Sequence, residues 1–180
     1  SIIDAGGEVL VCPPNARRNL TGMIYTAEAG EFYRTEEGNR RFLLPNMAAE
    51  HRRMEADWIG GFFEGLGIAT ESVAATWEAQ GDAIRGVDGD QIIHSWGVGP
   101  EARTDEAAYA EVADRLSGEH IHVQFDADPW FHGNTFMNVY RAADPDRDPP
   151  AVLLVCPDAL TDDSYDRLRG FVSEAEIVEI

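Results

Sequence analysis

Long apolar runs are missing from this chain of 180 residues. None approaches the ~20 residues that a helix needs to cross a bilayer, and nothing resembles a signal peptide. Cysteine is equally scarce, since only Cys12 and Cys156 occur, each directly before a proline. Two such residues build neither a disulfide framework nor a cysteine-based zinc site. We therefore expect a cytoplasmic protein that needs no membrane, metal or cofactor.

Basic residues are also few. The chain has 14 Lys and Arg against 33 Asp and Glu, a formal charge of 14 − 33 = −19. Such a balance argues against nucleic acid or an anionic membrane as a partner. It suits either a cationic ligand or an acid-coated surface adapted to salt, and the spread of acids over the whole chain favours the second explanation.

A repeat of about fifty residues organises the chain. Apolar patterning predicts the order strand, strand, helix, strand three times, and the length suits a single domain spanning residues 1–180. The first unit starts with strands within 22–33 and a helix whose stripe is predicted to contain Met47, Met54, Trp58, Phe62 and Leu66. The second unit is marked by an Asp88-Gly89 hairpin turn and by a helix over 104–117 that Thr104 caps. Residues 1–14 supply the helix end and last strand of one more unit, so we expect an α/β fold.

Polar residues recur at the start of each unit. Glu28 begins the first, Glu78 and Asp82 the second, and His132 the third, at spacings of 82 − 28 = 54 and 132 − 82 = 50 residues. If the units surround an axis, these side chains meet in one pocket. Clustered carboxylates suit a planar guanidinium, and a histidine beside them suits general acid and base catalysis. The alternative is that the glutamates are exposed turn acids.

Four segments, in order, resemble those of the guanidino-modifying enzymes, which include arginine deiminases, dimethylarginine dimethylaminohydrolases and amidinotransferases. They are GMIYTAEAGEF, WEAQGDA, GVGPEARTDEAA and FHGNT. The resemblance covers nearly all of the chain. It implies a pentein-type α/β propeller of ββαβ units around a central site, here incomplete, with about three full units and part of another.

The same resemblance implies roles for individual residues. His132 would be the general acid and base, and Glu78 or Asp82 the acid that orients it or the substrate. Glu28 would bind the substrate guanidinium, while Arg103 would bind a carboxylate. Asn134 stands at a substrate-binding position where the family has an aspartate, and Gly22 also replaces a frequent acid, so a substrate other than free arginine is expected.

The family attacks the guanidinium carbon with a cysteine thiolate, forming a covalent thiouronium intermediate. That cysteine would follow Ile180, because Cys12 and Cys156 are predicted to be strand-end thiols. We therefore expect a piece of a guanidino-group hydrolase or amidinotransferase acting on arginine or a derivative. The alternative is a non-catalytic binding or assembly module, which would form homo-oligomers.

A metal site is a further alternative. His120 and His122 are two residues apart in a predicted strand, with Asp126, Asp128 and His132 close in sequence. Such a set can suit zinc or another transition ion. Alternation along the strand explains the two histidines more simply, as the solvent face of a half-buried strand.

Overall fold

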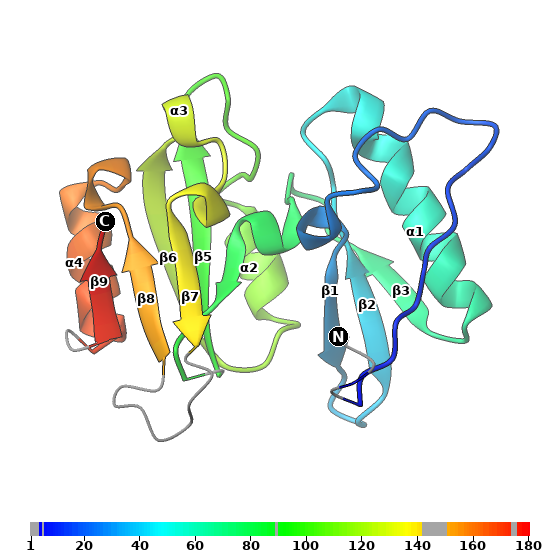
Figure 1. Ribbon diagram of the computed structural model, residues 1–180, viewed down its shortest axis with the longest axis horizontal. Coiled ribbons are helices and arrows are strands. Elements are labelled where there is room, and N and C mark those ends of the chain that lie inside the picture. The colour runs from blue at the N-terminus through cyan, green and yellow to red at the C-terminus, as the bar shows by residue number, and fades with distance from the viewer. Residues whose placement is uncertain (1–3, 5, 89, 142–150, 174–175) are drawn as a thin grey trace.

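Three small mixed sheets form the framework of the protein (Figure 1). The computed structural model describes the whole chain apart from residues 1–3, 5, 89, 142–150 and 174–175. Over the described residues it contains four α-helices, and the sheets follow one another across the molecule in chain order. None of these helices is long and apolar enough to cross a membrane.

The same ββαβ topology is repeated in each sheet, as the sequence pattern predicted. The middle strand pairs antiparallel with the strand before it and parallel with the strand that follows the helix. The first unit comprises β1 (Glu31–Arg34), β2 (Arg40–Leu44), α1 (Arg53–Gly65) and β3 (Ala69–Ser72). The second comprises β4 (Ala83–Arg85), β5 (Gln91–Val98), α2 (Ala108–Ala113) and β6 (Glu119–Asp126). The third comprises β7 (Met137–Arg141), β8 (Ala151–Val155), α4 (Asp162–Phe171) and β9 (Ile177–Glu179).

Short turns of 3₁₀ helix precede the first strand of every unit. They are η1 (Thr26–Glu28), η3 (Ala79–Gly81) and η4 (Gly133–Thr135), and the four-residue helix α3 (Ala127–Trp130) leads into the last of them. Two further 3₁₀ turns, η2 (Glu50–Arg52) and η5 (Pro157–Ala159), precede α1 and α4. The repeat of the sequence is therefore also a repeat of local structure.

Apolar side chains join neighbouring units. One core cluster combines Tyr33 and Leu43 of the first sheet with Val112 and Leu116 at the helix of the second unit. In the same way α4 packs against β6 of the preceding unit. Helix α4 begins at the cap residue Thr161, whose hydroxyl accepts the N–H of Ser164. Because each interface buries apolar surface from two units, the units hold one another in place.

The apolar face that helix α1 buries differs from the predicted stripe. Met47, which precedes the helix, is buried as predicted, but within α1 the buried apolar side chain is Ile59, and Met54 and Leu66 are exposed. Phe63, next to the predicted Phe62, is the aromatic residue that packs on the sheet. The run from Trp58 to Phe63 is almost continuously apolar, so its sequence alone does not determine which face is buried.

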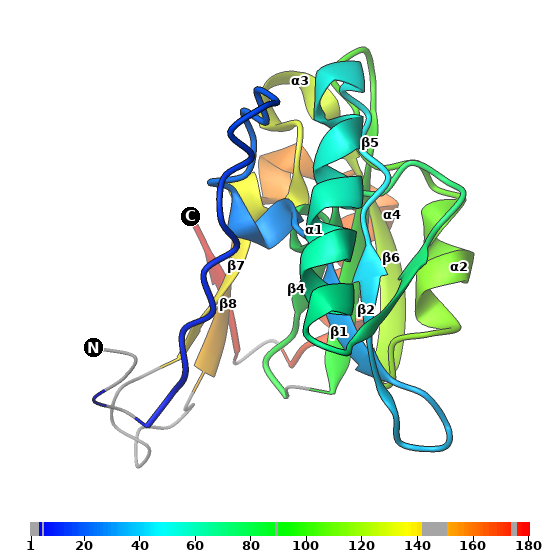
Figure 2. The ribbon, with the colours of Figure 1, turned by 90° about the vertical axis from the view of Figure 1, so that its right-hand side faces the viewer.

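Three further expectations were wrong in detail. Residues 22–25 form a turn rather than a strand, and residues 8–14 are irregular, running along the open side of the first unit (Figure 2). No neighbouring strand pairs with residues 8–14, and a strand needs such a partner. Helix α2 begins at Ala108 instead of residue 104, because Asp105 pairs with the backbone of Thr76. The predicted Asp88-Gly89 turn lies partly outside the described residues, because Gly89 is not among them.

Candidate active site

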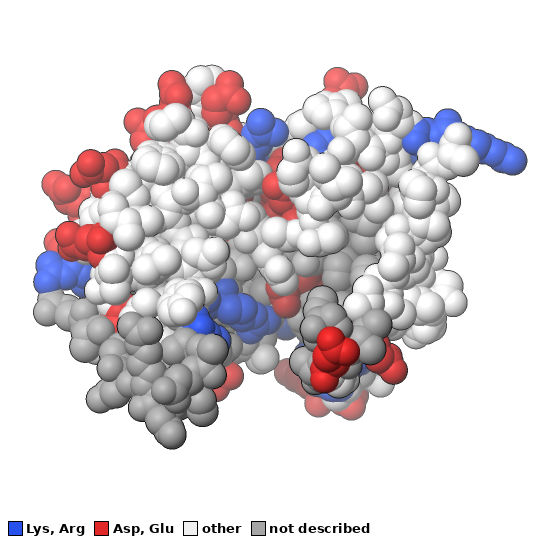
Figure 3. Space-filling view, in the orientation of Figure 1, with Lys and Arg blue, Asp and Glu red and all other residues white. Residues whose placement is uncertain are grey.

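The 3₁₀ turns at the starts of the units lie together, as the spacing predicted. Turn η3 contacts both η1 and η4. This arrangement brings Glu28, Glu78, Asp82 and His132 from three separate units into one cluster. In the space-filling view, acidic and basic side chains meet in the hollow between the halves of the molecule, in the region of these turns (Figure 3).

His132 is the centre of this cluster. Its side chain is only 4% exposed. Nδ1 lies 3.0 Å from Oδ2 of Asp82, whereas Nε2 faces Oε2 of Glu78 at 3.2 Å and Oε1 of Glu28 at 3.4 Å. Both ring nitrogens therefore contact carboxylates, and those carboxylates come from the other two units.

Asp82 accepts hydrogen bonds through both carboxylate oxygens. Oδ1 accepts the hydroxyl of Ser95 at 2.9 Å and the amide of Gly133 at 2.8 Å. Oδ2 accepts the hydroxyl of Thr104 at 2.6 Å, in addition to Nδ1 of His132. At Gly133 a side chain would collide with Ser95, since its Cβ would lie 2.0 Å from the hydroxyl oxygen. Four donors thus fix this carboxylate in place.

Glu78 presents one satisfied and one unsatisfied oxygen. Oε1 accepts the amide of Ala48 at 2.9 Å. Oε2 is buried without a well-aligned hydrogen bond, although Nε2 of His132 lies 3.2 Å away. A buried carboxylate oxygen in this state is costly, and a donor supplied by a ligand would stabilise it.

Arg52 also belongs to the site, although the sequence did not predict it. Its guanidinium forms an ion pair with Glu28 and donates to Oε2 of the buried Glu55 through Nε and Nη2, at 3.1 and 3.0 Å. Gly22 makes room for it, because a Cβ there would lie 2.1 Å from Nε of Arg52. Glu28 thus pairs with the guanidinium of Arg52, and its binding of a substrate guanidinium stays a prediction.

The charges of the cluster shift the pKa values of its members, among them His132 and Glu28. Burial alone would lower the pKa of His132, but the close contacts with Asp82, Glu28 and Glu78, with the negative charge of Asp82, raise the pKa to about 11. For Glu28, burial works in the opposite direction, and the contacts with His132 and Arg52 outweigh it and lower the pKa. The structure therefore favours an imidazolium flanked by carboxylates at neutral pH.

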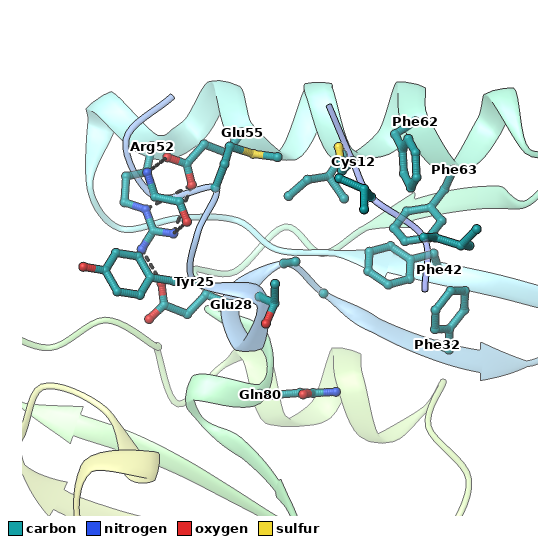
Figure 4. A pocket seen from close by; sticks show the side chains of 18 of the residues that line it. Cys12, Tyr25, Glu28, Phe32, Phe42, Arg52, Glu55, Phe62, Phe63 and Gln80 are labelled. Carbon is teal, nitrogen blue, oxygen red and sulfur yellow. Dashed lines mark hydrogen bonds and ion pairs between the residues drawn. The ribbon is translucent and has the colours of Figure 1, made fainter. Parts of the chain in front are cut away.

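A cavity of about 570 Å³ opens beside Glu28 (Figure 4). Arg52, Glu55 and Tyr25 lie at one end of it, near Glu28. The other end is apolar and is lined by the rings of Phe32, Phe42, Phe62 and Phe63. A ligand with a cationic head and an apolar or aliphatic part would match both ends.

Two predicted substrate-binding residues lie away from the carboxylate cluster. Arg103 stacks over the ring of Phe131, the neighbour of His132, and its Nη2 lies 3.9 Å from Glu101. Asn134 is exposed and lines a second groove, of about 530 Å³, with Gln80 and Arg141. Neither side chain contacts His132 in this structure.

The proposed zinc set does not assemble. His132 points into the carboxylate cluster, whereas His120 hydrogen-bonds to Nε2 of His94 at 2.9 Å in the second sheet. His120 and His122 are half-buried, and Tyr109 of α2 packs against the ring of His122, so α2 partly covers this face of β6. Over the described part of the chain, only Glu28, Glu78 and His132 have ligand atoms close enough to share a metal ion, within 4.8 Å of one another.

Neither cysteine reaches the cluster. Cys156 lies at the end of β8, where its amide donates to the carbonyl of Phe136. Cys12 lines the apolar part of the cavity, and burial raises the pKa of its thiol. Both are described in the structure, and neither forms a hydrogen bond with His132, Glu78 or Glu28.

Solved structures provide the comparison with known proteins. The N-terminal domain of ArgZ, an arginine dihydrolase from the ornithine–ammonia cycle in Cyanobacteria, is 17% identical at a TM-score of 0.78, over 99% of this chain and 59% of that one. AgrE, in its ternary complex with ornithine and NAD⁺, is 19% identical at a TM-score of 0.77, over 99% of this chain and 24% of that one. A dimethylarginine dimethylaminohydrolase is 19% identical at a TM-score of 0.52, over 99% and 62%.

This chain spans less than two thirds of the length of each of these proteins. No family model matches the sequence, and no curated protein does. At identities below a fifth, the likeness concerns the fold, and it agrees with the resemblance carried by the four sequence segments. The chain has the fold of the guanidino-modifying pentein superfamily.

Proposed function

We propose that the chain is part of a guanidino-group hydrolase or amidinotransferase acting on arginine or an arginine derivative. The observation that carries this proposal is the position of His132, buried between carboxylates that come from the other two units. The fold neighbours support it, since they include an arginine dihydrolase and a dimethylarginine dimethylaminohydrolase. In this proposal the three ββαβ units are consecutive blades of a propeller.

The charge of the site favours a cationic ligand. Glu28, Glu55, Glu78 and Asp82 are four carboxylates, and Arg52 and protonated His132 are two cations, which leaves a formal excess of two negative charges. Carboxylates grip a guanidinium through parallel hydrogen bonds. The unsatisfied Oε2 of Glu78 is the atom best placed to accept one of them.

Each acid receives a distinct role in this proposal. Asp82 orients His132, because its four bound donors leave no oxygen for a substrate. Glu78 and Glu28 flank Nε2 and bind the substrate guanidinium. His132 then donates a proton from Nε2 to the departing nitrogen and later accepts one from the attacking water or amine. Arg103 would bind a carboxylate at the far end of the substrate.

A cysteine outside these 180 residues would supply the nucleophile. Cys12 and Cys156 do not contact His132, and the raised pKa of the Cys12 thiol works against a thiolate. The N-terminal domain of ArgZ has been solved with a reaction intermediate bound covalently and, as a cysteine-to-serine mutant, with its substrate. The same chemistry here requires a cysteine encoded after Ile180.

The alternative is a binding module without catalysis. The absence of a thiol beside His132 among the described residues favours it. This module would bind guanidino compounds and release no product, and its open sheet edges would be covered by oligomerisation.

Turnover by the protein from its complete reading frame tests the proposal. With L-arginine and dimethylarginine as substrates, we expect release of ammonia or an amine, and its loss in His132→Ala. His94→Gln, which changes another buried histidine, is the matched control and should keep its activity. Binding without turnover by the complete protein would support the module, whereas turnover by His132→Ala would refute the assigned role.

A further inference from the structure

Thr104 occupies a buried position between the two acids of the second unit. It lies in the loop between β5 and α2 and is 6% exposed. Its hydroxyl donates to Oδ2 of Asp82 at 2.6 Å and accepts the backbone N–H of Glu78 at 3.1 Å. The residue that looked like a helix cap therefore joins the backbone of one acid to the carboxylate of the other.

The direction of these hydrogen bonds is fixed by chemistry. A backbone N–H can only donate, and a hydroxyl carries a single proton. Since Glu78 N–H donates to Thr104, the hydroxyl proton of Thr104 must point toward Asp82. On the other oxygen of Asp82, the N–H of Gly133 is an obligate donor as well.

Asp82 is therefore held as an acceptor from several sides. Nδ1 of His132, at 3.0 Å from Oδ2, must carry the proton of that contact. Nε2, the ring nitrogen that does not contact Asp82, faces Glu28 and Glu78. The two backbone amides thus fix the direction of these hydrogen bonds and place a proton on Nδ1, and Nε2 is the nitrogen that faces the other acids.

We propose that Thr104 is a positioning residue, whose hydroxyl keeps Asp82 an acceptor for Nδ1 and leaves Nε2 of His132 as the reacting nitrogen. This inference rests on the proposed function, because it gives Nε2 the proton-transfer role. A purely structural Thr104 would hold the loop in place without influencing the His132 ring.

Nitrogen and proton NMR of the His132 imidazole separates these two roles without requiring turnover. In Thr104→Val the hydroxyl is lost at similar volume, whereas Thr104→Ser keeps it. We expect the proton on Nδ1 of His132 to exchange with water at least about tenfold faster in Thr104→Val, because loss of one charge-assisted hydrogen bond loosens the carboxylate. Thr104→Ser should exchange within about twofold of the unchanged protein.

Thr161→Val is the matched control. It removes a threonine hydroxyl that caps α4, far along the chain from the site. It should lower thermal stability and leave Nδ1 exchange unchanged. Thr104→Ala, which places no extra methyl against the carboxylate, is the second variant if Thr104→Val does not fold, and it should show the same acceleration.

Unchanged exchange in a folded Thr104→Val or Thr104→Ala protein would overturn the inference, as would equal acceleration in Thr161→Val. In the active protein, loss of the hydroxyl should lower kcat by about tenfold or more with KM changed less than twofold, since the ring is misplaced rather than the substrate. The NMR comparison needs no substrate, so it tests the effect of Thr104 on His132 whether or not the protein is active. Absence of turnover would refute the proposed function alone.

Discussion

Two buried histidines of this protein respond to burial in opposite ways. His132 and His94 are 3% and 5% exposed. The pKa of His132 is raised to about 11, whereas burial, together with the positive charges of His120, His122 and Arg85, lowers the pKa of His94 to about 3. Burial penalises the imidazolium at both positions, so the neighbouring charges decide the outcome.

The neighbours differ because the two residues have different places in the repeat. His132 stands at a unit start, where acids of the other two units meet it. His94 lies within β5. Tyr109 packs against its ring, and His120 is hydrogen-bonded to its Nε2. A position where three units meet thus surrounds His132 with acids that favour its charged form, whereas a position inside one sheet leaves His94 without such acids.

The difference affects stability at opposite ends of the pH scale. Unfolding returns both residues to an ordinary pKa of 6.5. The folded state holds the His132 proton more tightly, so the stabilisation from His132 is complete below pH 6.5 and declines as the pH rises toward 11. The folded state excludes a proton from His94, so its contribution is complete above pH 6.5 and declines as the pH falls toward 3.

Replacing His132 with glutamine should give the largest effect. Glutamine carries no charge, so Glu28, Glu78 and Asp82 lose the cation between them. We expect the free energy of unfolding at pH 7 to fall by about 3–5 kcal/mol. Urea denaturation measures it, and a loss below about 1 kcal/mol would contradict the view that the imidazolium neutralises the cluster.

Asp82→Asn should bring the pKa of His132 closer to that of His94. Removal of the adjacent negative charge is expected to lower the pKa of His132 by about 1–3 pH units. Titration of its imidazole resonance measures the change. An unchanged midpoint would show that Glu28 and Glu78 alone sustain the charge of His132.

Replacing His94 with glutamine tests the other member of the pair. Between pH 6.5 and about 4.5, the His94 contribution should reduce the stability of the unchanged protein by up to about 1.4 kcal/mol per pH unit, and His94→Gln should show a flatter curve. Thermal or urea unfolding at several pH values gives the difference between the two proteins. Parallel curves would mean that His94 accepts a proton in the folded state.

Arg103→Ala should have the smallest effect on stability. Its partner Glu101 is exposed and 3.9 Å away, so we expect a change below about 0.5 kcal/mol. Calorimetric affinities for arginine and for agmatine, which lacks the carboxylate, test its proposed role. A selective loss of arginine binding is expected, and equal losses for both ligands would contradict it.

The repeat explains which site residues could be found from the sequence. Glu28, Glu78, Asp82 and His132 recur at equivalent positions, and equivalent positions converge when units share an axis. Arg52 and Glu55 could not be recognised, because an arginine and a glutamate three residues apart look like any exposed helix pair. Their burial depends on Gly22, which is distant in sequence and contacts them only in the fold.

Local signals failed where tertiary contacts competed with them. The pattern of Thr104, Asp105 and Glu106 fits a helix start, yet the hydroxyl of Thr104 bonds to Asp82 and the backbone of Asp105 to Thr76. Threonine and aspartate side chains form helix caps and also hydrogen-bond within functional sites, so the sequence could not distinguish the two roles. The order of strands and helices from residue 31 onward was predictable, because apolar alternation is a local signal.

The buried contacts between units also bear on how the protein unfolds. Glu28, Asp82 and His132 are separated by about fifty residues each, so no single unit contains the neutralised cluster. If the third unit detaches, His132 leaves with it, and carboxylates of the first two units repel one another in a site built to hold a cation. Detachment of one unit therefore weakens the junction between the other two. The cluster of carboxylates around His132, by this reasoning, makes unfolding of the three units a shared, cooperative event.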